Sequence, residues 1–294
     1  MINGLEAIGG LSFDASTKKI QGKPENAGEH YIEFEYITTH KQKIKLLVNH
    51  NPRTLWKNIP SKQDIKADDE SECLYNKRQQ RIILAASKRG RSHEHKGISR
   101  DDHFTVYSKK NWIITVVADG AGSARLSGLG SKIVCETSND LIRKELSSKD
   151  GLLSDQISNY FRNSKEAKPL RTSLYNILAN SAFQSYKALS KEAEKIHERI
   201  QLFHTTLLIT ISKKFDFGYF IGSFQIGDGI SAIYRKDKEV ILLGWPDSGE
   251  YAGQTKFVTD KSLISSGEEL MKRIQYKIVP DYDLIEEIWQ DRPE

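Results

Sequence analysis

Acidic side chains stand at three places where a strand-like segment begins or ends, and each place could bind a cation. Asp101 and Asp102 lie in GISRDDHF, directly before the strand-like FTVY. Asp119 follows the apolar run WIITVVA and precedes Gly120, and Asp228 follows FQIG and also precedes a glycine. Carboxylates gathered at one rim of a sheet repel each other, and burial raises their pKa values. Such a cluster is tolerated only when protons or a cation lie between the oxygens.

The ligand chemistry of these positions points to a hard divalent cation. Ligation by oxygen atoms alone selects Mg²⁺ or Mn²⁺, whose octahedral shells keep several waters. Gly120 has no Cβ, so its carbonyl and the backbone that follows can approach an ion closely. Two ions that share a carboxylate would hold a bridging water, lower its pKa and bind a phosphate oxygen.

Each motif also has a simpler interpretation. Asp-Gly is a common turn dipeptide, so GDG alone is a weak signal. The RDD segment alone could be a solvated loop or a helix cap, and ADGAG could be a tight turn. The three motifs together, in this order, favour the metal site over separate turns.

The elements that must position these carboxylates fall into one predicted α+β domain, residues 79–294. Strand-like segments come first, around RQQRIILAASKRG and NWIITVVADG. Helical periodicity follows from SGLGSK to RKEL, then around 155–161 and over 169–200. Strands resume with TTLLITISK, FGYFIGSFQIGDG, ISAIYRK and EVILLG. Strands, then helices, then strands indicate an α+β fold rather than a doubly wound parallel sheet.

Residues 1–50 are predicted to form a small β-rich domain, and 51–78 a polar linker. The stretch from Gly10 to Val48 resembles a short bacterial immunoglobulin-like repeat in its Gly-Leu-aromatic-Asp start, its Ile-x-Gly-x-Pro turn and its Ala-Gly before a long strand. The resemblance implies part of a sandwich used for docking or spacing. An unrelated β-hairpin extension is the alternative.

The segments SKRGRSHEHKGISRDDHF, WIITVVADGAGSARLSGLGSKIVCE, HTTLLITI, FQIGDGISAIYR and GEYAGQTKFVTD carry a second resemblance. Together, over Ala85 to Asp283, they resemble a bacterial branch of the metal-dependent PPM, or 2C-type, serine/threonine protein phosphatases. The family implies an α-β-β-α sandwich of two antiparallel sheets flanked by helices. It also implies hydrolysis of phosphoserine or phosphothreonine by water activated at a binuclear Mn²⁺ or Mg²⁺ centre, with no phosphoenzyme.

By position, the resemblance makes Asp102 a metal ligand and lets Asp101 hold waters beside it. Asp119 would bridge the two metals, the Gly120 carbonyl would bind one of them, and Asp228 would help to hold a third, weaker metal.

The same resemblance places a phosphate-binding side chain in the basic run Arg91, His93, Lys96 and Arg100, without singling out one of the four. An exposed basic loop is the alternative for His93 and its neighbour His95. The residue directly after Asp119 and Gly120 is Ala121 and not a histidine, the acid that some relatives have there. Protonation of the leaving group therefore falls to a water or to His93.

The sequence departs from the family near its end. The family's later Thr/Ser-Asp-Gly and Asp-Asn motifs, which complete the metal shells, do not appear after RIQYKIVPDYDLI. Asp281, Asp283, Glu286 and Glu287 are acidic substitutes that do not match the motif. The alternative function is therefore a catalytically impaired pseudophosphatase that acts as a phosphoprotein-binding adaptor.

Composition limits the partners. The net charge of +5 is spread along 294 residues without aromatic interleaving, so we predict no nucleic-acid partner. The two cysteines, Cys73 and Cys135, are far apart in the sequence and lie in unlike sequence contexts, which argues against a disulfide framework. No signal peptide or membrane-spanning run stands out. We therefore expect a cytoplasmic protein whose partner is a phosphorylated protein, a target of a bacterial Ser/Thr kinase.

Overall fold

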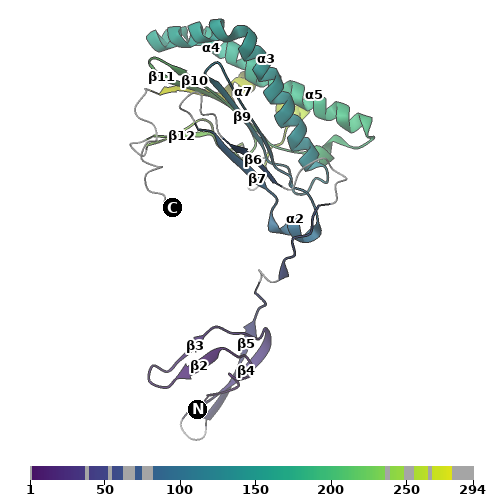
Figure 1. The fold of residues 1–294 in the computed structure, drawn as a ribbon, viewed down its shortest axis with the longest axis vertical. Coiled ribbons are helices and arrows are strands. Elements are labelled where there is room, and N and C mark those ends of the chain that lie inside the picture. Colours follow the sequence, from purple (N-terminus) through teal and green to yellow (C-terminus); the bar gives the residue numbers. More distant parts are fainter. Residues whose placement is uncertain are drawn as a thin grey trace. The chain divides into compact units, whose positions relative to one another are not determined.

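The structure, a computed structural model, forms two compact units, Met1–Ile59 and Pro60–Glu294 (Figure 1). It describes residues 2–36, 40–51, 55–61, 70–74, 82–235, 239–247, 255–263 and 267–279. The predicted linker 51–78 lies partly outside these ranges. All four late acidic candidates between 281 and 287 lie entirely outside them. Their proposed roles stay predictions.

The first unit is β-rich, as predicted. It holds a three-stranded antiparallel sheet in the order β1 (Ile2–Asn3), β4 (Gly28–Tyr36) and β5 (His40–Val48), and a hairpin of β2 (Leu11–Asp14) and β3 (Lys19–Gly22). Leu5, Ile8 and Ile32 form its small buried core. The immunoglobulin-like identity of this unit stays a prediction.

The second unit is built on a five-stranded antiparallel sheet. Its order is β14 (Ile274–Val279), β11 (Gly218–Ile226), β10 (Leu207–Phe215), β9 (Trp112–Ala118) and β8 (His103–Lys109). Alternation along β9 shows why the sheet has one core face, since Trp112, Ile114 and Val116 are buried while the residues between them are more exposed. The antiparallel α+β prediction is confirmed.

Helices cover this core face of the sheet (Figure 1). They are α3 (Ser127–Arg162), α4 (Ala167–Leu174) and α5 (Asn180–Lys195), with a π-helical turn at Tyr175–Ala179 and short 3₁₀ turns at Ser164–Glu166 and Ile200–Phe203. The sequence predicted a separate helix around 155–161. Instead, α3 continues through it across a kink at Lys149, where φ is −111° and ψ is 15°.

Smaller elements complete the described part of this unit. Two hairpins pair β6 (Glu70–Leu74) with β7 (Leu84–Lys88), and β12 (Ala232–Tyr234) with β13 (Val240–Leu242). Three short helices are α2 (Arg91–Lys96), α6 (Asp260–Leu263) and α7 (Gly267–Lys272). Among the described residues, the large sheet is thus accompanied by hairpins rather than by a second sheet of equal size.

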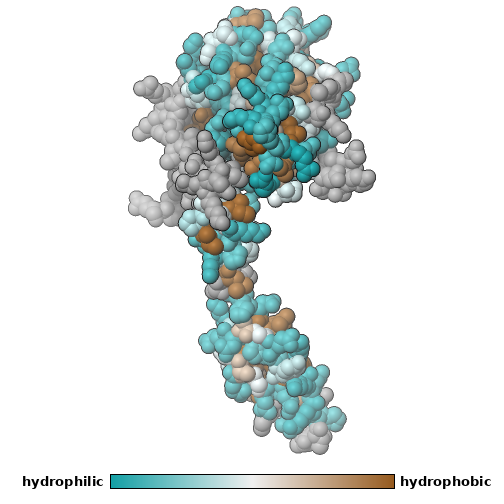
Figure 2. Space-filling view, turned by 90° about the vertical axis from the view of Figure 1, so that its right-hand side faces the viewer, coloured by the Kyte–Doolittle hydropathy of each residue, from teal (hydrophilic) through white to brown (hydrophobic). Residues whose placement is uncertain are grey.

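On the face that Figure 2 shows, hydrophilic side chains surround smaller hydrophobic areas. Within the described ranges, every helix is too short or too polar to pass through a bilayer.

Candidate metal centre

The antiparallel topology brings the predicted acidic residues to one edge of the sheet. His103, at the start of β8, pairs with Ala118, at the end of β9, so Asp102 and Asp119 leave neighbouring strands at the same edge. Leu207 pairs with Ile226 in the same way, which places the end of β11, and Asp228 shortly after it, at that edge too. Strands that alternate in direction produce this arrangement without any further folding.

The turn that carries Asp119 is held by the segment before β10. The Asp119 amide donates to Thr206 Oγ1 at 2.9 Å, and the Asp119 carbonyl accepts from Thr205 Oγ1 and from the Thr206 amide, each at 2.9 Å. The Ala121 amide donates to the His204 carbonyl at 2.9 Å. These bonds come from residues more than 80 positions away in the chain. The turn is therefore a fixed tertiary feature rather than an independent Asp-Gly turn.

Gly120 allows two loops to approach each other. It is buried, and a Cβ at this position would lie 2.5 Å from the Asp101 carbonyl oxygen. Its amide donates to Asp102 Oδ1 at 3.3 Å. The sequence predicts that Gly120 leaves room for an ion. In the structure, the missing Cβ leaves room for the backbone of Asp101.

The carboxylates at this edge affect each other's protonation. Asp119 is exposed as a residue, yet partial burial of its carboxylate raises its pKa to about 6, assisted by a side-chain hydrogen bond with Asp102 and by the negative charges of Asp102, Asp228 and Asp101. Burial also raises the pKa of Asp101, and the His93 ring opposes that rise. A proton on Asp119 relieves the repulsion that a cation would otherwise relieve.

This donor set fits a hard cation in its chemistry, because it consists of carboxylate oxygens on a fixed backbone. The side chains of this set do not, however, converge on one point. Over the ranges that the structure describes, no three His, Cys, Asp or Glu side chains converge tightly enough to hold one ion.

His93 contacts the acidic cluster. Its Nδ1 lies 2.8 Å from the Ser99 carbonyl oxygen, and its Nε2 lies 3.4 Å from Asp101 Oδ2. Both ring nitrogens therefore face oxygen acceptors, which directs the ring at the carboxylate. In this arrangement His93 positions Asp101, and its role toward phosphate stays a prediction.

The other three basic candidates separate by burial. Arg100 is only 2% exposed, and its guanidinium donates to the Asp102 carbonyl at 2.7 Å and lies 3.1 Å from His103 Nδ1. Because those nitrogens are already engaged inside the protein, Arg100 is less available for phosphate than the exposed cations, and its role toward phosphate stays a prediction. Arg91 and Lys96 are exposed on α2.

Arg100→Met is expected to destabilise the fold by about 2 kcal/mol, because the Asp102 carbonyl loses the charged donor that the buried Arg100 side chain supplies. Urea unfolding at pH 7.5 measures this change. Arg125→Met is the matched control, since the Arg125–Glu198 pair lies at the surface, where such pairs contribute about 0–1 kcal/mol. Equal losses in the two variants would contradict the positioning role of Arg100.

Several residues of the site were not singled out by sequence reasoning. Thr205 and Thr206 hold the Asp119 turn, and Thr255 Oγ1 donates to Asp228 Oδ2 at 2.9 Å. Ser131 Oγ donates to the Asp101 carbonyl from α3. A polar His-Thr-Thr run directly before an apolar strand was the available signal. His204 itself stacks on Phe257 with ring centroids 5.1 Å apart, as expected for a structural residue.

Comparison with known proteins identifies the family of this chain. The protein phosphatase 2C family matches residues 89–283, which is more than half of the sequence. The chain belongs to this family. No curated protein matches the sequence.

Similar solved structures are themselves phosphatases. A bacterial serine phosphatase shares 11% identity over 72% of each chain, with a TM-score of 0.34. Serine/threonine phosphatase Stp1 from Staphylococcus aureus shares 11% identity over 76% of this chain and 71% of its own, with a TM-score of 0.33. Serine-threonine phosphatase 2C from Toxoplasma gondii shares 10% identity over 67% of this chain and 55% of its own, with a TM-score of 0.35.

Proposed function

We propose that this protein hydrolyses phosphoserine or phosphothreonine in other proteins with the help of two Mn²⁺ or Mg²⁺ ions. The observation that carries the proposal is the meeting of Asp101, Asp102, Asp119 and Asp228 at one sheet edge. There, partial burial and the neighbouring carboxylates raise the pKa of Asp119 to about 6. In this proposal Asp102, Asp119 and the Gly120 carbonyl would hold the ions, and Asp101 would orient waters beside them. Asp228 would help to hold a further, weaker ion.

The bound ions would supply Lewis acidity and a water of lowered pKa. The chain's own residues supply the positions. The threonine pair before β10 fixes the backbone of Asp119, the Arg100 guanidinium fixes that of Asp102, and His93 orients Asp101. Ligands held in this way keep their geometry when side chains rotate inward to meet a cation.

The substrate side of the proposal rests on exposed cations. Arg91 and Lys96 on α2 are the remaining candidates for phosphate contact, since Arg100 is buried. His93 is engaged by Asp101, so we assign protonation of the leaving group to solvent. We place the reaction in the cytoplasm, acting on a target of a bacterial Ser/Thr kinase.

Calorimetric titration with Mn²⁺ tests the metal centre directly. We expect two ions to bind per chain, and we expect binding to weaken as the pH falls through about 6, where a proton on Asp119 competes with the ion. Asp155→Asn, a neutral change at an exposed position of α3, is the control and should leave the titration unchanged. Absence of heat and of any change in melting temperature at millimolar Mn²⁺ would overturn the proposed centre.

A second candidate function is a phosphoprotein-binding adaptor without turnover. It is favoured by the separation of the acidic side chains, which do not form a closed three-ligand set within the described ranges. This candidate predicts that binding of a phosphoserine peptide persists in EDTA. Loss of peptide binding on chelation, together with Mn²⁺-dependent phosphate release, would exclude it.

A further inference from the structure

A basic groove lies at the end of β8 and β9 remote from the acidic cluster. β8 has seven residues, so at about 3.3 Å per residue its two ends are about 20 Å apart. Lys110 and Asn111 form the turn between the two strands, with φ values of 49° and 65°. Both values belong to the left-handed region that tight hairpin turns use. The turn therefore presents its lysines at a defined place.

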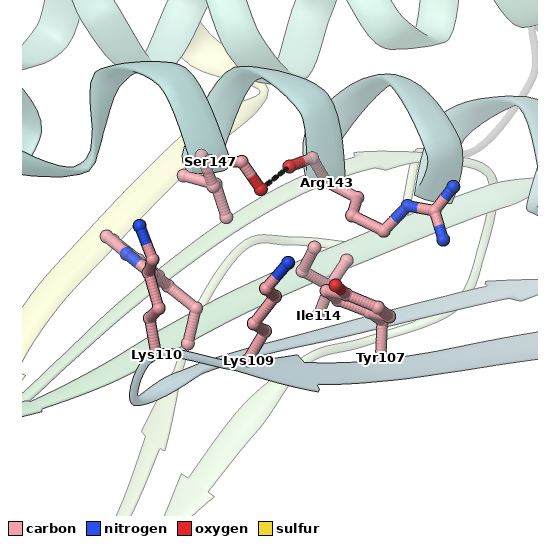
Figure 3. Close-up of a pocket in the computed structure, with 8 residues that line it drawn as sticks. Tyr107, Lys109, Lys110, Ile114, Arg143 and Ser147 are labelled. Carbon is pink, nitrogen blue, oxygen red and sulfur yellow. Dashed lines mark hydrogen bonds between the residues drawn. The ribbon is translucent and has the colours of Figure 1, made fainter.

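The groove runs between this hairpin and α3. It is an open hollow of about 490 Å³ lined by Tyr107, Lys109, Arg143, Lys144, Ser147 and Ser148. Figure 3 shows the small pocket that adjoins this hollow and shares Tyr107, Lys109, Arg143 and Ser147 with it. In this view Lys109 and Lys110 rise from the strands toward the helix, and Arg143 extends from the helix above Tyr107. None of these lining residues is acidic.

The charges in the groove are mostly free to meet a ligand. Lys109, Lys110 and Lys144 are exposed, and none of them forms an ion pair with another described residue. Arg143 is partly committed, because it pairs with Asp140 at 3.0 Å and lies over the Tyr107 ring. The hydroxyls of Ser147 and Ser148 donate to carbonyls of α3, so the cations would provide the attraction.

We propose that this groove docks an acidic segment of a partner protein. Lys109 and Lys144 line the hollow, and Lys110 stands beside it in the hairpin turn. These three lysines, which form no ion pair with another described residue, match a run of Asp, Glu or phosphorylated side chains. Nucleic acid fits less well, because single strands need exposed rings for stacking. Here the Tyr107 ring is covered by the Arg143 guanidinium, and Trp112 is 2% exposed. The inference needs only binding and does not rest on phosphatase activity.

The test measures binding of a fluorescein-labelled octaglutamate peptide by anisotropy, in EDTA and at low salt. We expect the triple variant Lys109→Glu/Lys110→Glu/Lys144→Glu to bind the peptide at least about tenfold more weakly. Each attraction between an exposed lysine and a peptide carboxylate is replaced by repulsion between two carboxylates. The control, Lys165→Glu/Lys168→Glu/Lys191→Glu, makes the same change of charge at exposed helix positions and should weaken binding less than about threefold.

Three results would overturn the inference. These are failure of the wild type to bind the peptide, an equal loss in both triple variants, and tighter binding of a single-stranded 20-nucleotide DNA than of the peptide. The binding assay contains EDTA, so its result does not depend on turnover. A wild-type protein that binds the peptide in this assay, yet hydrolyses no phosphoester in a separate assay with Mn²⁺, would contradict the proposed function while supporting the docking groove.

Discussion

Asp119→Asn is expected to abolish Mn²⁺-dependent phosphate release, lowering kcat/KM for a phosphoserine peptide by at least about 100-fold. The amide has nearly the same shape as the carboxylate but lacks its charge, so the proposed bridge between two ions is lost. The backbone bonds from Thr205 and Thr206 do not involve the side chain and should persist. The loss would therefore reflect chemistry rather than misfolding.

The same substitution should stabilise the metal-free protein at neutral pH. Burial and neighbouring carboxylates raise the folded-state pKa of Asp119 to about 6 from an ordinary value of 3.8. The ionised form is thus disfavoured in the fold, and the stability that its proton confers is lost as pH rises from about 4 through 6. The full shift corresponds to about 3 kcal/mol, which solvent screening reduces to about 1 kcal/mol.

Thermal melting in EDTA measures this effect. At pH 7.5 we expect Asp119→Asn to melt about 2–4 °C above the wild type, and the difference should vanish as the pH approaches 4. Millimolar Mn²⁺ should reverse the order, because only the wild type gains from binding the ion. A variant that melts below the wild type in EDTA at pH 7.5 would show that the carboxylates at this edge do not repel each other.

Gly120→Ala is expected to damage both stability and activity. Its Cβ would meet the Asp101 carbonyl oxygen at 2.5 Å, so the loop carrying Asp119 must move away from the loop carrying Asp101 and Asp102. We expect a loss of about 2 kcal/mol in the free energy of unfolding, as for other overpacked sites. A shift of the loop by about 1 Å would lower kcat by about 100-fold.

Gly122→Ala is the matched control, two residues along the same loop. A Cβ there has no neighbour within 4 Å, so stability and kcat should stay close to those of the wild type. Urea unfolding and steady-state kinetics on both variants decide the matter. If Gly120→Ala retained wild-type kcat, the close approach of the two loops would have no part in the reaction.

The element order was predictable from local pattern. The apolar run at WIITVVA and its neighbours gave strands of the expected type, because alternation and β-branched residues depend only on nearby positions. The boundary between two helices near residue 149 was not predictable, since the chain there continues as one helix through a kink at Lys149.

By itself, the sequence predicted the kind of chemistry, because Asp101, Asp102, Asp119 and Asp228 each stand at the start or the end of a recognisable strand. Only the tertiary structure decided which basic residues remain available. Arg100 and His93 look alike as members of one basic run, yet one is buried against a backbone carbonyl and the other holds Asp101. Spacing along a chain specifies residue type and local shape, whereas burial and hydrogen-bond partners depend on segments up to a hundred positions away, such as the threonines before β10.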